Sequence, residues 1–315
     1  MMHFIEYLAS GDFGLSEGSM YERLRRNANN KFDTHIAHGG IIYNAVGVKA
    51  LRQLHEEYLD VGKRYGMAMF ALTDTWRSSA ERIDSSEFRG RRVNEDNAAF
   101  LDSIRRTFND PRRPVYLGGL LGPKGDAYKP AEAPPTEDAL DYHTPQVDAL
   151  AGTAVDFLCA MAMPAFAECL GMARAMARTG LPYVLSFVIR PDGRLLDNTP
   201  IVEAIGRIDN EARQAPAGYG VNCVHPEVLH SALKIIRARD SRIAQRLVSF
   251  QANTSRKRPE ELDGLEALET EDPETLADLM VGIRNEYGIN FMGGCCGTDG
   301  SHIESLAKQY RAAQE

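Results

Sequence analysis

Residues 220–252 read GVNCVHPEVLHSALKIIRARDSRIAQRLVSFQA, and the order of patterns in this stretch decides the fold. A short apolar run, 220–224, is followed by a segment, 226–239, whose apolar residues recur every three to four positions, as on one face of a helix. A second apolar run occupies 246–252. The order strand, helix, strand predicts two parallel strands joined by a helix that packs on their sheet.

The same alternation runs through the rest of the chain. Extended segments are expected at 15–17, 67–73, 114–120, 154–161, 183–189, 220–224, 246–252 and 289–293. Helices are expected at 42–65, 95–108, from about 146, and at 165–178, 200–213, 226–239, 273–287 and 302–314. Eight such units in 315 residues predict an α/β fold, a single-domain (β/α)8 TIM barrel over residues 1–315. A doubly wound sheet is the alternative.

The composition excludes several classes of protein. Hydrophobic residues make up 43% and charged residues 25% of the chain, as in globular domains, and the net charge of -8 predicts no nucleic-acid or membrane partner. The sequence contains no apolar run of about 18 residues, so no membrane-spanning helix is expected. Residues 1–15 lack the pattern of a secretory signal. We therefore expect a cytoplasmic protein. The sequence is compatible with a homo-oligomer and does not define the oligomeric state.

Two segments that follow strand ends show neither the apolar run of a strand nor the periodic apolar residues of a helix. Residues 122–145 contain five prolines, and residues 256–272 are rich in charge. In a barrel both would be loops on the C-terminal face, where active sites of this fold lie. They are either lids over a site or solvated surface loops.

Three cysteines carry the candidate chemistry. Cys223 ends a predicted strand in GVNC, and Cys295 and Cys296 follow another in GGCCGT. Strands six and eight of a barrel end on the same rim, so these thiols can converge although 72 positions separate Cys223 from Cys295. Glycines on both sides of the adjacent pair allow the chain to turn there.

Three thiolates are suitable ligands for Zn²⁺, and three protein ligands leave a fourth position open, as in catalytic zinc sites. A metal in such a site deprotonates a coordinated thiol, and the thiolate is the nucleophilic form. The alternatives are that the cysteines are small buried hydrophobes, or that Cys295 and Cys296 form a disulfide with each other.

The motifs GVNC and GGCCGT, with His302 shortly after in GTDGSHI, resemble the homocysteine S-methyltransferase family. The segments LSEGS at 15–19, LTDTW at 72–76 and GGLLGP at 118–123 resemble the ends of its first three strands. The resemblance covers nearly the whole chain. It implies a (β/α)8 barrel whose catalytic zinc is held by Cys223, Cys295 and Cys296.

The resemblance also implies substrate-binding residues. Glu17 stands where the family has an aspartate that contacts the substrate ammonium, and Gly18 and Ser19 would offer backbone N–H groups to the substrate carboxylate. Asp74 replaces an asparagine, and Trp76, at the family's aromatic position, is suited to face a donor cation.

Met161 departs from the pattern, because the family has a glutamate there that helps to hold the amino group of homocysteine. A buried amino group without a carboxylate partner is costly. Either Glu17 alone holds that group, with Asp74 as a second negative charge nearby, or the thiol substrate lacks the amino acid head.

We therefore expect a zinc-dependent methyltransferase that moves a methyl group from an onium donor to a thiol. The expected acceptor is homocysteine, which would give methionine, and the donor is of the S-methylmethionine, S-adenosylmethionine or betaine type. The alternatives are a thiol without the amino acid head, a zinc hydrolase, and a zinc-binding barrel without activity. Cys159 and Cys169 are expected in the core, and His35 and His38 in a loop or at the surface.

Overall fold

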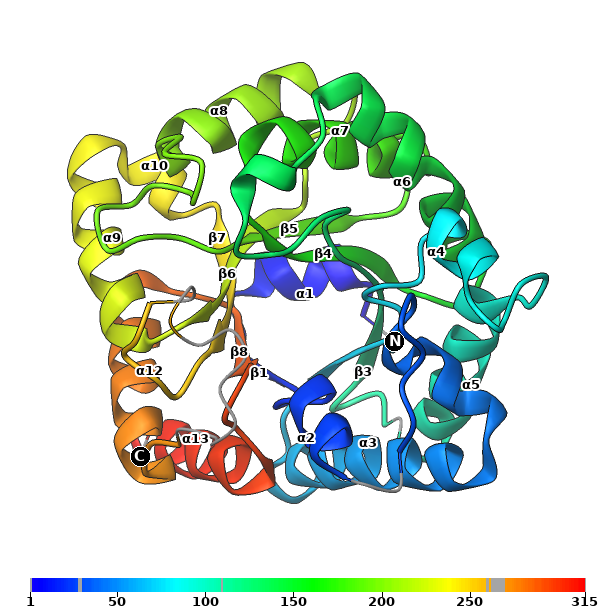
Figure 1. Ribbon diagram of the computed structural model, residues 1–315. Helices are drawn as coiled ribbons and strands as arrows, with labels where there is room; N and C mark the ends of the chain where they lie inside the picture. The colour runs from blue at the N-terminus through cyan, green and yellow to red at the C-terminus, as the bar shows by residue number, and fades with distance from the viewer. Residues whose placement is uncertain (1, 28–29, 109, 259–260, 262–269, 315) are drawn as a thin grey trace.

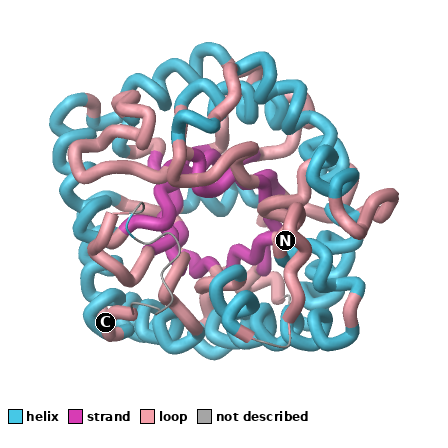
Figure 2. Tube along the Cα trace, viewed as in Figure 1, coloured by secondary structure: helices cyan, strands magenta, loops and turns pink. Residues whose placement is uncertain are grey.

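The computed structural model describes residues 2–27, 30–108, 110–258, 261 and 270–314. Eight parallel strands follow one another in chain order around a closed barrel, and the last pairs with the first. Figure 1 shows the helices as an outer ring, and Figure 2 separates the inner strands from that ring by colour. The predicted (β/α)8 barrel is confirmed and the doubly wound sheet is wrong, because the barrel is closed and has no edge strand.

The strands are β1 (Gly14–Ser16), β2 (Met69–Leu72), β3 (Val115–Leu121), β4 (Phe157–Met163), β5 (Tyr183–Phe187), β6 (Gly218–Val224), β7 (Leu247–Ala252) and β8 (Phe291–Gly294). The long outer helices are α3 (Ala45–Tyr65), α5 (Val93–Phe108), α6 (Thr136–Ala151), α7 (Phe166–Ala177), α8 (Ile201–Glu211), α9 (Pro226–Arg239), α12 (Pro273–Tyr287) and α13 (Gly300–Ala312). Shorter helices are α1 (Phe4–Ser10), α2 (Tyr21–Arg26), η1 (His38–Tyr43), α4 (Ala80–Ser85), η2 (Pro130–Glu132) and α10 (Ser241–Ala244).

The unit from β6 to β7 shows why the sequence folds in this way. Every residue of β6 is buried, because a barrel strand faces packed side chains inside and helices outside. The buried residues of α9 include Leu229, Ala232, Leu233 and Ile236, which recur at helical spacing and face the sheet.

Aromatic rings fill the N-terminal end of the barrel. The ring centroids of Phe4 and Phe157 are 4.2 Å apart, as are those of Phe70 and Phe291. Phe4 comes from α1, which lies across this end of the barrel (Figure 1). Burying a ring of this size contributes about 1.5–3 kcal/mol. With this end packed, a site has room only at the opposite, C-terminal end.

One of the two predicted loops needs correction, and the other lies largely outside the described residues. Helix α6 begins at Thr136 and contains Pro145, so residues 136–145 of the predicted loop 122–145 are helical. The predicted loop ended at Pro145, whereas the helix of the structure continues through this proline. Of the second predicted loop, 256–272, residues 259–260 and 262–269 lie outside the described residues. Within the described part of the chain, no helix is long and apolar enough to cross a bilayer.

Candidate active site

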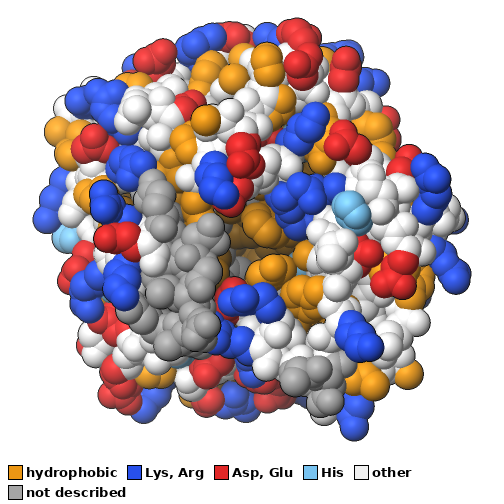
Figure 3. Space-filling model, viewed as in Figure 1, with side chains coloured by type: hydrophobic (Ala, Val, Ile, Leu, Met, Phe, Trp, Pro, Cys, Tyr) orange, Lys and Arg blue, Asp and Glu red, His pale blue; other side chains and the backbone are white. Residues whose placement is uncertain are grey.

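A pocket of about 1160 Å³ opens at the C-terminal end of the barrel. Its walls come from residues at or after the ends of β1, β2, β3, β4, β6, β7 and β8. Figure 3 shows the corresponding hollow in the middle of the molecule, with lysine and arginine side chains around it. Parallel strands direct their carboxyl ends to one rim, so residues far apart in the sequence meet here.

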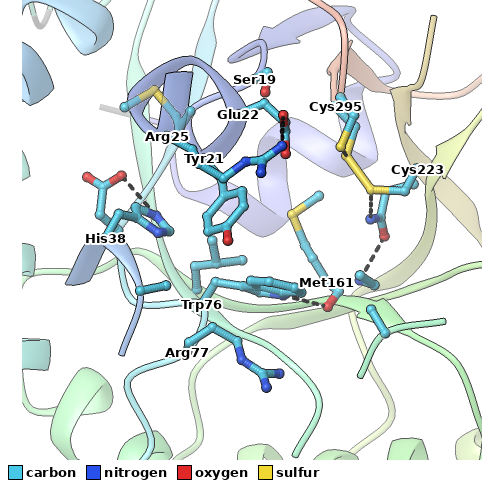
Figure 4. Close-up of a pocket in the computed structure, with 18 of the residues that line it drawn as sticks. Ser19, Tyr21, Glu22, Arg25, His38, Trp76, Arg77, Met161, Cys223 and Cys295 are labelled. Atoms are coloured by element: carbon cyan, nitrogen blue, oxygen red, sulfur yellow. Dashed lines mark hydrogen bonds and ion pairs between the residues drawn. A yellow bond between two sulfur atoms is a disulfide. The ribbon is translucent and has the colours of Figure 1, made fainter. Parts of the chain in front are cut away.

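The three predicted thiols lie together on this rim. The sulfur atoms of Cys223, Cys295 and Cys296 all lie within 4.8 Å of one another. Cys223 is the last residue but one of β6 and has a left-handed backbone, φ 57°, and the adjacent pair follows β8. Cys223 and Cys295 form a disulfide, drawn in Figure 4, and Cys296 is free. The expected alternative of a disulfide between the two adjacent cysteines is therefore wrong.

The donor set fits a thiophilic metal ion. Sulfur ligands about 2.3 Å from a tetrahedral Zn²⁺ lie roughly 3.8 Å apart, and the sulfur atoms of Cys295 and Cys296 are 3.9 Å apart. Binding would first require reduction of the Cys223–Cys295 disulfide. Burial, with the nearby Glu22 carboxylate, raises the pKa of the Cys296 thiol to about 12. Without a cation this thiol is therefore protonated at neutral pH, and a bound metal would displace its proton.

Asn222 holds the sulfur atom of Cys223 in place. Its Nδ2 atom lies 3.3 Å from the Cys223 sulfur and donates a hydrogen bond to it. Its Oδ1 atom accepts hydrogen bonds from the Ser186 hydroxyl (2.6 Å) and the Ala162 amide (3.0 Å). Bonds from two other strands thus fix the amide, as outer-shell groups orient metal ligands. Asn222 was not among the predicted site residues, although a polar residue inside a buried apolar strand indicates a special role.

A buried chain of acids and histidines forms the wall beside β1 and β2. The Nδ1 atom of His55 lies 2.5 Å from Glu17 Oε1, and its Nε2 atom lies 2.9 Å from Asp74 Oδ2. Glu17 Oε2 accepts the Leu72 amide at 3.0 Å. Burial alone would lower the pKa of His55, but Glu17 and Asp74 raise it to about 10. With both acids ionised, the His55 imidazolium balances one of their two charges and leaves a net charge of −1.

This network revises two expectations. Asp74 adds no unpaired carboxylate, because its charge faces His55. His38, expected in a loop or at the surface, is only 3% exposed, and its Nε2 atom lies 3.5 Å from Asp74 Oδ1. It follows Ala37, whose backbone has a positive φ of 53°, and burial lowers the pKa of His38. His55 was not among the predicted site residues; it lies on the buried face of α3 with Leu51 and Tyr58.

The other predicted substrate residues also line the pocket. Gly18 packs against the Tyr58 ring, where a Cβ atom would lie 2.8 Å from ring atoms. The Ser19 amide donates to the Thr298 hydroxyl at 3.1 Å, so this predicted carboxylate donor is already engaged. Trp76 donates from its indole nitrogen to the Met161 carbonyl at 3.2 Å, and both side chains line the pocket (Figure 4).

Two further residues in the pocket were not expected from the sequence. The ring of Tyr21 lies 6.2 Å from that of Trp76, centroid to centroid. The Arg77 guanidinium carbon lies 5.3 Å from the centroid of the Trp76 ring. Both line the pocket. In the sequence, these two residues are distinguished only by being close to the predicted residues Ser19 and Trp76. Closeness in sequence does not show which way a side chain points.

The fold and the site define a class of protein, the (β/α)8 barrels with a thiol cluster on the strand-end rim. The homocysteine S-methyltransferase family matches residues 15–310. The chain therefore belongs to the homocysteine S-methyltransferase family, and the prediction of a methyltransferase is confirmed at the level of the family.

Individual relatives agree with this assignment at low identity. Homocysteine S-methyltransferase YbgG of Bacillus subtilis is 23% identical over 278 residues, covering 83% of this chain and 84% of that protein. Homocysteine S-methyltransferase 4 of Zea mays is 22% identical over 305 residues, covering 88% of this chain and 86% of that protein. The metallated form of the homocysteine methyltransferase MmuM from Escherichia coli superposes with a TM-score of 0.76 at 18% identity, over 96% of this chain and 98% of that one. This last likeness shows the fold.

Proposed function

We propose that this protein is a zinc-dependent S-methyltransferase that moves a methyl group from an onium donor to a thiol, with homocysteine as the first acceptor to test. The observation that carries the proposal is the group of three sulfur atoms within 4.8 Å at the mouth of the barrel. The family supports methyl transfer, and the metallated form of a structural relative supports a metal.

Each part of the pocket has a role in this reaction. Cys223, Cys295 and Cys296 would hold Zn²⁺, which when bound supplies the acidity that keeps a substrate thiol as a thiolate near pH 7. Asn222 keeps Cys223 directed at the cluster. An onium donor releases a neutral sulfide or amine, so the residues need not supply a proton to the leaving group. The walls position the two substrates and exclude water.

The pocket wall formed by residues at the ends of β1 and β2 attracts positive charge. The rings of Tyr21 and Trp76 face the same space, and such rings attract onium groups. Glu17, His55 and Asp74 add a net charge of −1 at the wall. These groups suit the donor cation or the ammonium group of an amino acid acceptor.

A second acceptor class is favoured by one specific observation. Met161 provides no charge, and both oxygen atoms of Glu17 already accept hydrogen bonds from His55 and Leu72. The pocket thus has fewer free acceptors for an amino group than the family pattern implies. A thiol that lacks the amino acid head is therefore the alternative substrate. The cytoplasmic location and the domain bounds 1–315 stay predictions.

A turnover screen tests the proposal. Reduced, zinc-loaded protein is mixed with homocysteine or with thiols that lack the amino group. Each thiol is paired with S-methylmethionine, S-adenosylmethionine, glycine betaine or dimethylsulfoniopropionate, and the methylated thiol is measured by mass spectrometry. At least one pair is expected to give a product that disappears when the zinc is removed. Absence of product in every pair would favour a zinc-binding barrel without activity.

Replacing Met161 with glutamate is expected to lower the KM for homocysteine roughly 10-fold, because a carboxylate would then be available to the amino group. Met161 lines the pocket, so the new side chain needs no space in the core. Steady-state kinetics with homocysteine measures the effect. Met161→Gln, which adds a similar shape without charge, is the control. An unchanged KM in Met161→Glu would contradict our account of this position.

A further inference from the structure

The part of the pocket wall that follows β2 contains two arginines that pair with no carboxylate of the described residues. Arg77 and Arg82 both line it, and within the described residues neither pairs with a carboxylate. The Nη1 atom of Arg77 donates to the carbonyls of Pro123 (2.9 Å) and Gly125 (2.7 Å). Arg82 donates to the carbonyls of His35 and Lys124, each at 3.0 Å. Carbonyl groups are neutral, so the two positive charges are not balanced by these bonds.

The guanidinium of Arg77 keeps one edge free. Its Nη1 atom uses both hydrogens on Pro123 and Gly125, and no hydrogen bond in the described structure uses Nε or Nη2. These two atoms form the edge that binds a carboxylate through two parallel hydrogen bonds. Asp126 is the carboxylate whose charge acts on Arg77, and this carboxylate lies 3.2 Å from Lys129.

Burial and then the charge of Arg82 lower the pKa of Arg77. Both causes mean that the charged guanidinium is less stable here than in water. An anion placed against its free edge would relieve both of them. The half-buried Arg77 is therefore a position where an anionic ligand gains more than at an exposed arginine.

Arg77 is connected to the thiols by a short series of contacts. Its guanidinium lies beside the Trp76 ring, and Trp76 bonds to the Met161 carbonyl. The next amide, of Ala162, bonds to Asn222, which in turn bonds to Cys223. In Figure 4, Trp76 and Met161 lie between Arg77 and the cysteines. The thiols and the Arg77 guanidinium thus lie on opposite sides of Trp76 and Met161 in one pocket.

We infer that Arg77, with Arg82 beside it, binds a carboxylate carried by one of the two substrates, an inference that rests on the proposed function. The carboxylate belongs to the donor, as in a betaine or a sulfoniopropionate, or to an amino acid acceptor. In either case the substrate spans the pocket, with its positive or reacting group towards the thiols and its carboxylate at Arg77. Of the two backbone donors predicted for a substrate carboxylate, the amide of Ser19 is already engaged with Thr298.

Equilibrium binding tests the inference without turnover. Calorimetry on reduced, zinc-loaded protein compares two pairs of ligands that differ only at the carboxylate. The donor pair is dimethylsulfoniopropionate and its alcohol analogue dimethyl(3-hydroxypropyl)sulfonium, and the acceptor pair is homocysteine and 3-aminopropanethiol. The wild type is expected to prefer the carboxylate in one pair by about 10- to 100-fold. The pair that shows the preference identifies the source of the carboxylate.

The variant Arg77→Met is expected to lose that preference while it still binds the ligand without a carboxylate. A general loosening of the pocket would weaken both members of a pair, so the ratio isolates the carboxylate contact. Arg77→Lys should retain part of the preference, and Arg89→Met, at an exposed arginine, should retain all of it. A wild type without preference in either pair, or a preference that survives in Arg77→Met, would overturn the inference. Product formation is scored separately, so a failed methyl transfer is not mistaken for a failed carboxylate site.

Discussion

Cys296→Ala is expected to remove bound zinc and to lower methyl transfer on the order of 1000-fold, since the metal supplies several kcal/mol of stabilisation to the reacting thiol. Cys296 is the informative cysteine, because it is free whereas Cys223 and Cys295 form a disulfide. Any loss of zinc in this variant therefore cannot be explained by loss of that disulfide. Zinc per chain is measured by atomic emission on reduced protein, and methyl transfer by product formation.

Cys159→Ala is the matched control. Cys159 is also free, but it is buried in the cluster of aromatic side chains inside the barrel and is not among the residues that line the pocket. This variant should keep its zinc and its activity and lose only the small stability of a buried side chain. If Cys296→Ala kept one zinc ion per chain and wild-type activity, the three-thiol site would be the wrong description of the metal centre.

His55→Leu is expected to lower the free energy of unfolding by about 3–5 kcal/mol, because it leaves two buried carboxylates without their counter-charge. His55 is fully buried between Glu17 and Asp74. Urea unfolding followed by circular dichroism measures the change. His230→Leu is the control, since His230 also pairs with a glutamate, Glu286, but both are 40% exposed. The control should change by less than about 1 kcal/mol.

The pH dependence of the stability is a second test of the network of Glu17, His55 and Asp74. His55 has its pKa raised from 6.5 to about 10 in the folded protein. A raised pKa contributes stability that is fully present below pH 6.5 and is lost as the pH rises towards 10. The wild type should therefore lose more stability than His55→Leu between pH 6.5 and pH 10. Parallel curves for the two proteins would show that His55 is not the imidazolium described here.

Much of the fold was predictable because it depends on local patterns. The helices 226–239 and 273–287 agree with α9 and α12 at both ends, since each begins at a proline and has a regular apolar face. Helix α6 was placed ten residues too late, because the sequence rule for Pro145 takes no account of the packing around it. Loop and helix compete within such segments, and local propensity does not decide between them.

The site residues also fall into those that could be predicted from local sequence patterns and those that could not. Cys223, Cys295 and Cys296 could be found from the sequence because two motifs end strands, and parallel strands end on one rim. His38, His55 and Arg77 could not be assigned roles, because their roles depend on which side chains face them. Glu17 and Asp74 meet at His55 only after β1, β2 and α3 have packed together.

The sequence by itself therefore determined the barrel and its thiol cluster, since periodicity and strand-end position are properties of the chain alone. The tertiary structure alone decided how the charges around the cluster are balanced. It joined Asp74 to His55, turned His38 inward and left one edge of Arg77 free. Electrostatic interactions depend on distance and burial in space. The sequence does not show either of these for His55 and its partners Asp74 and Glu17, which are 19 and 38 positions away.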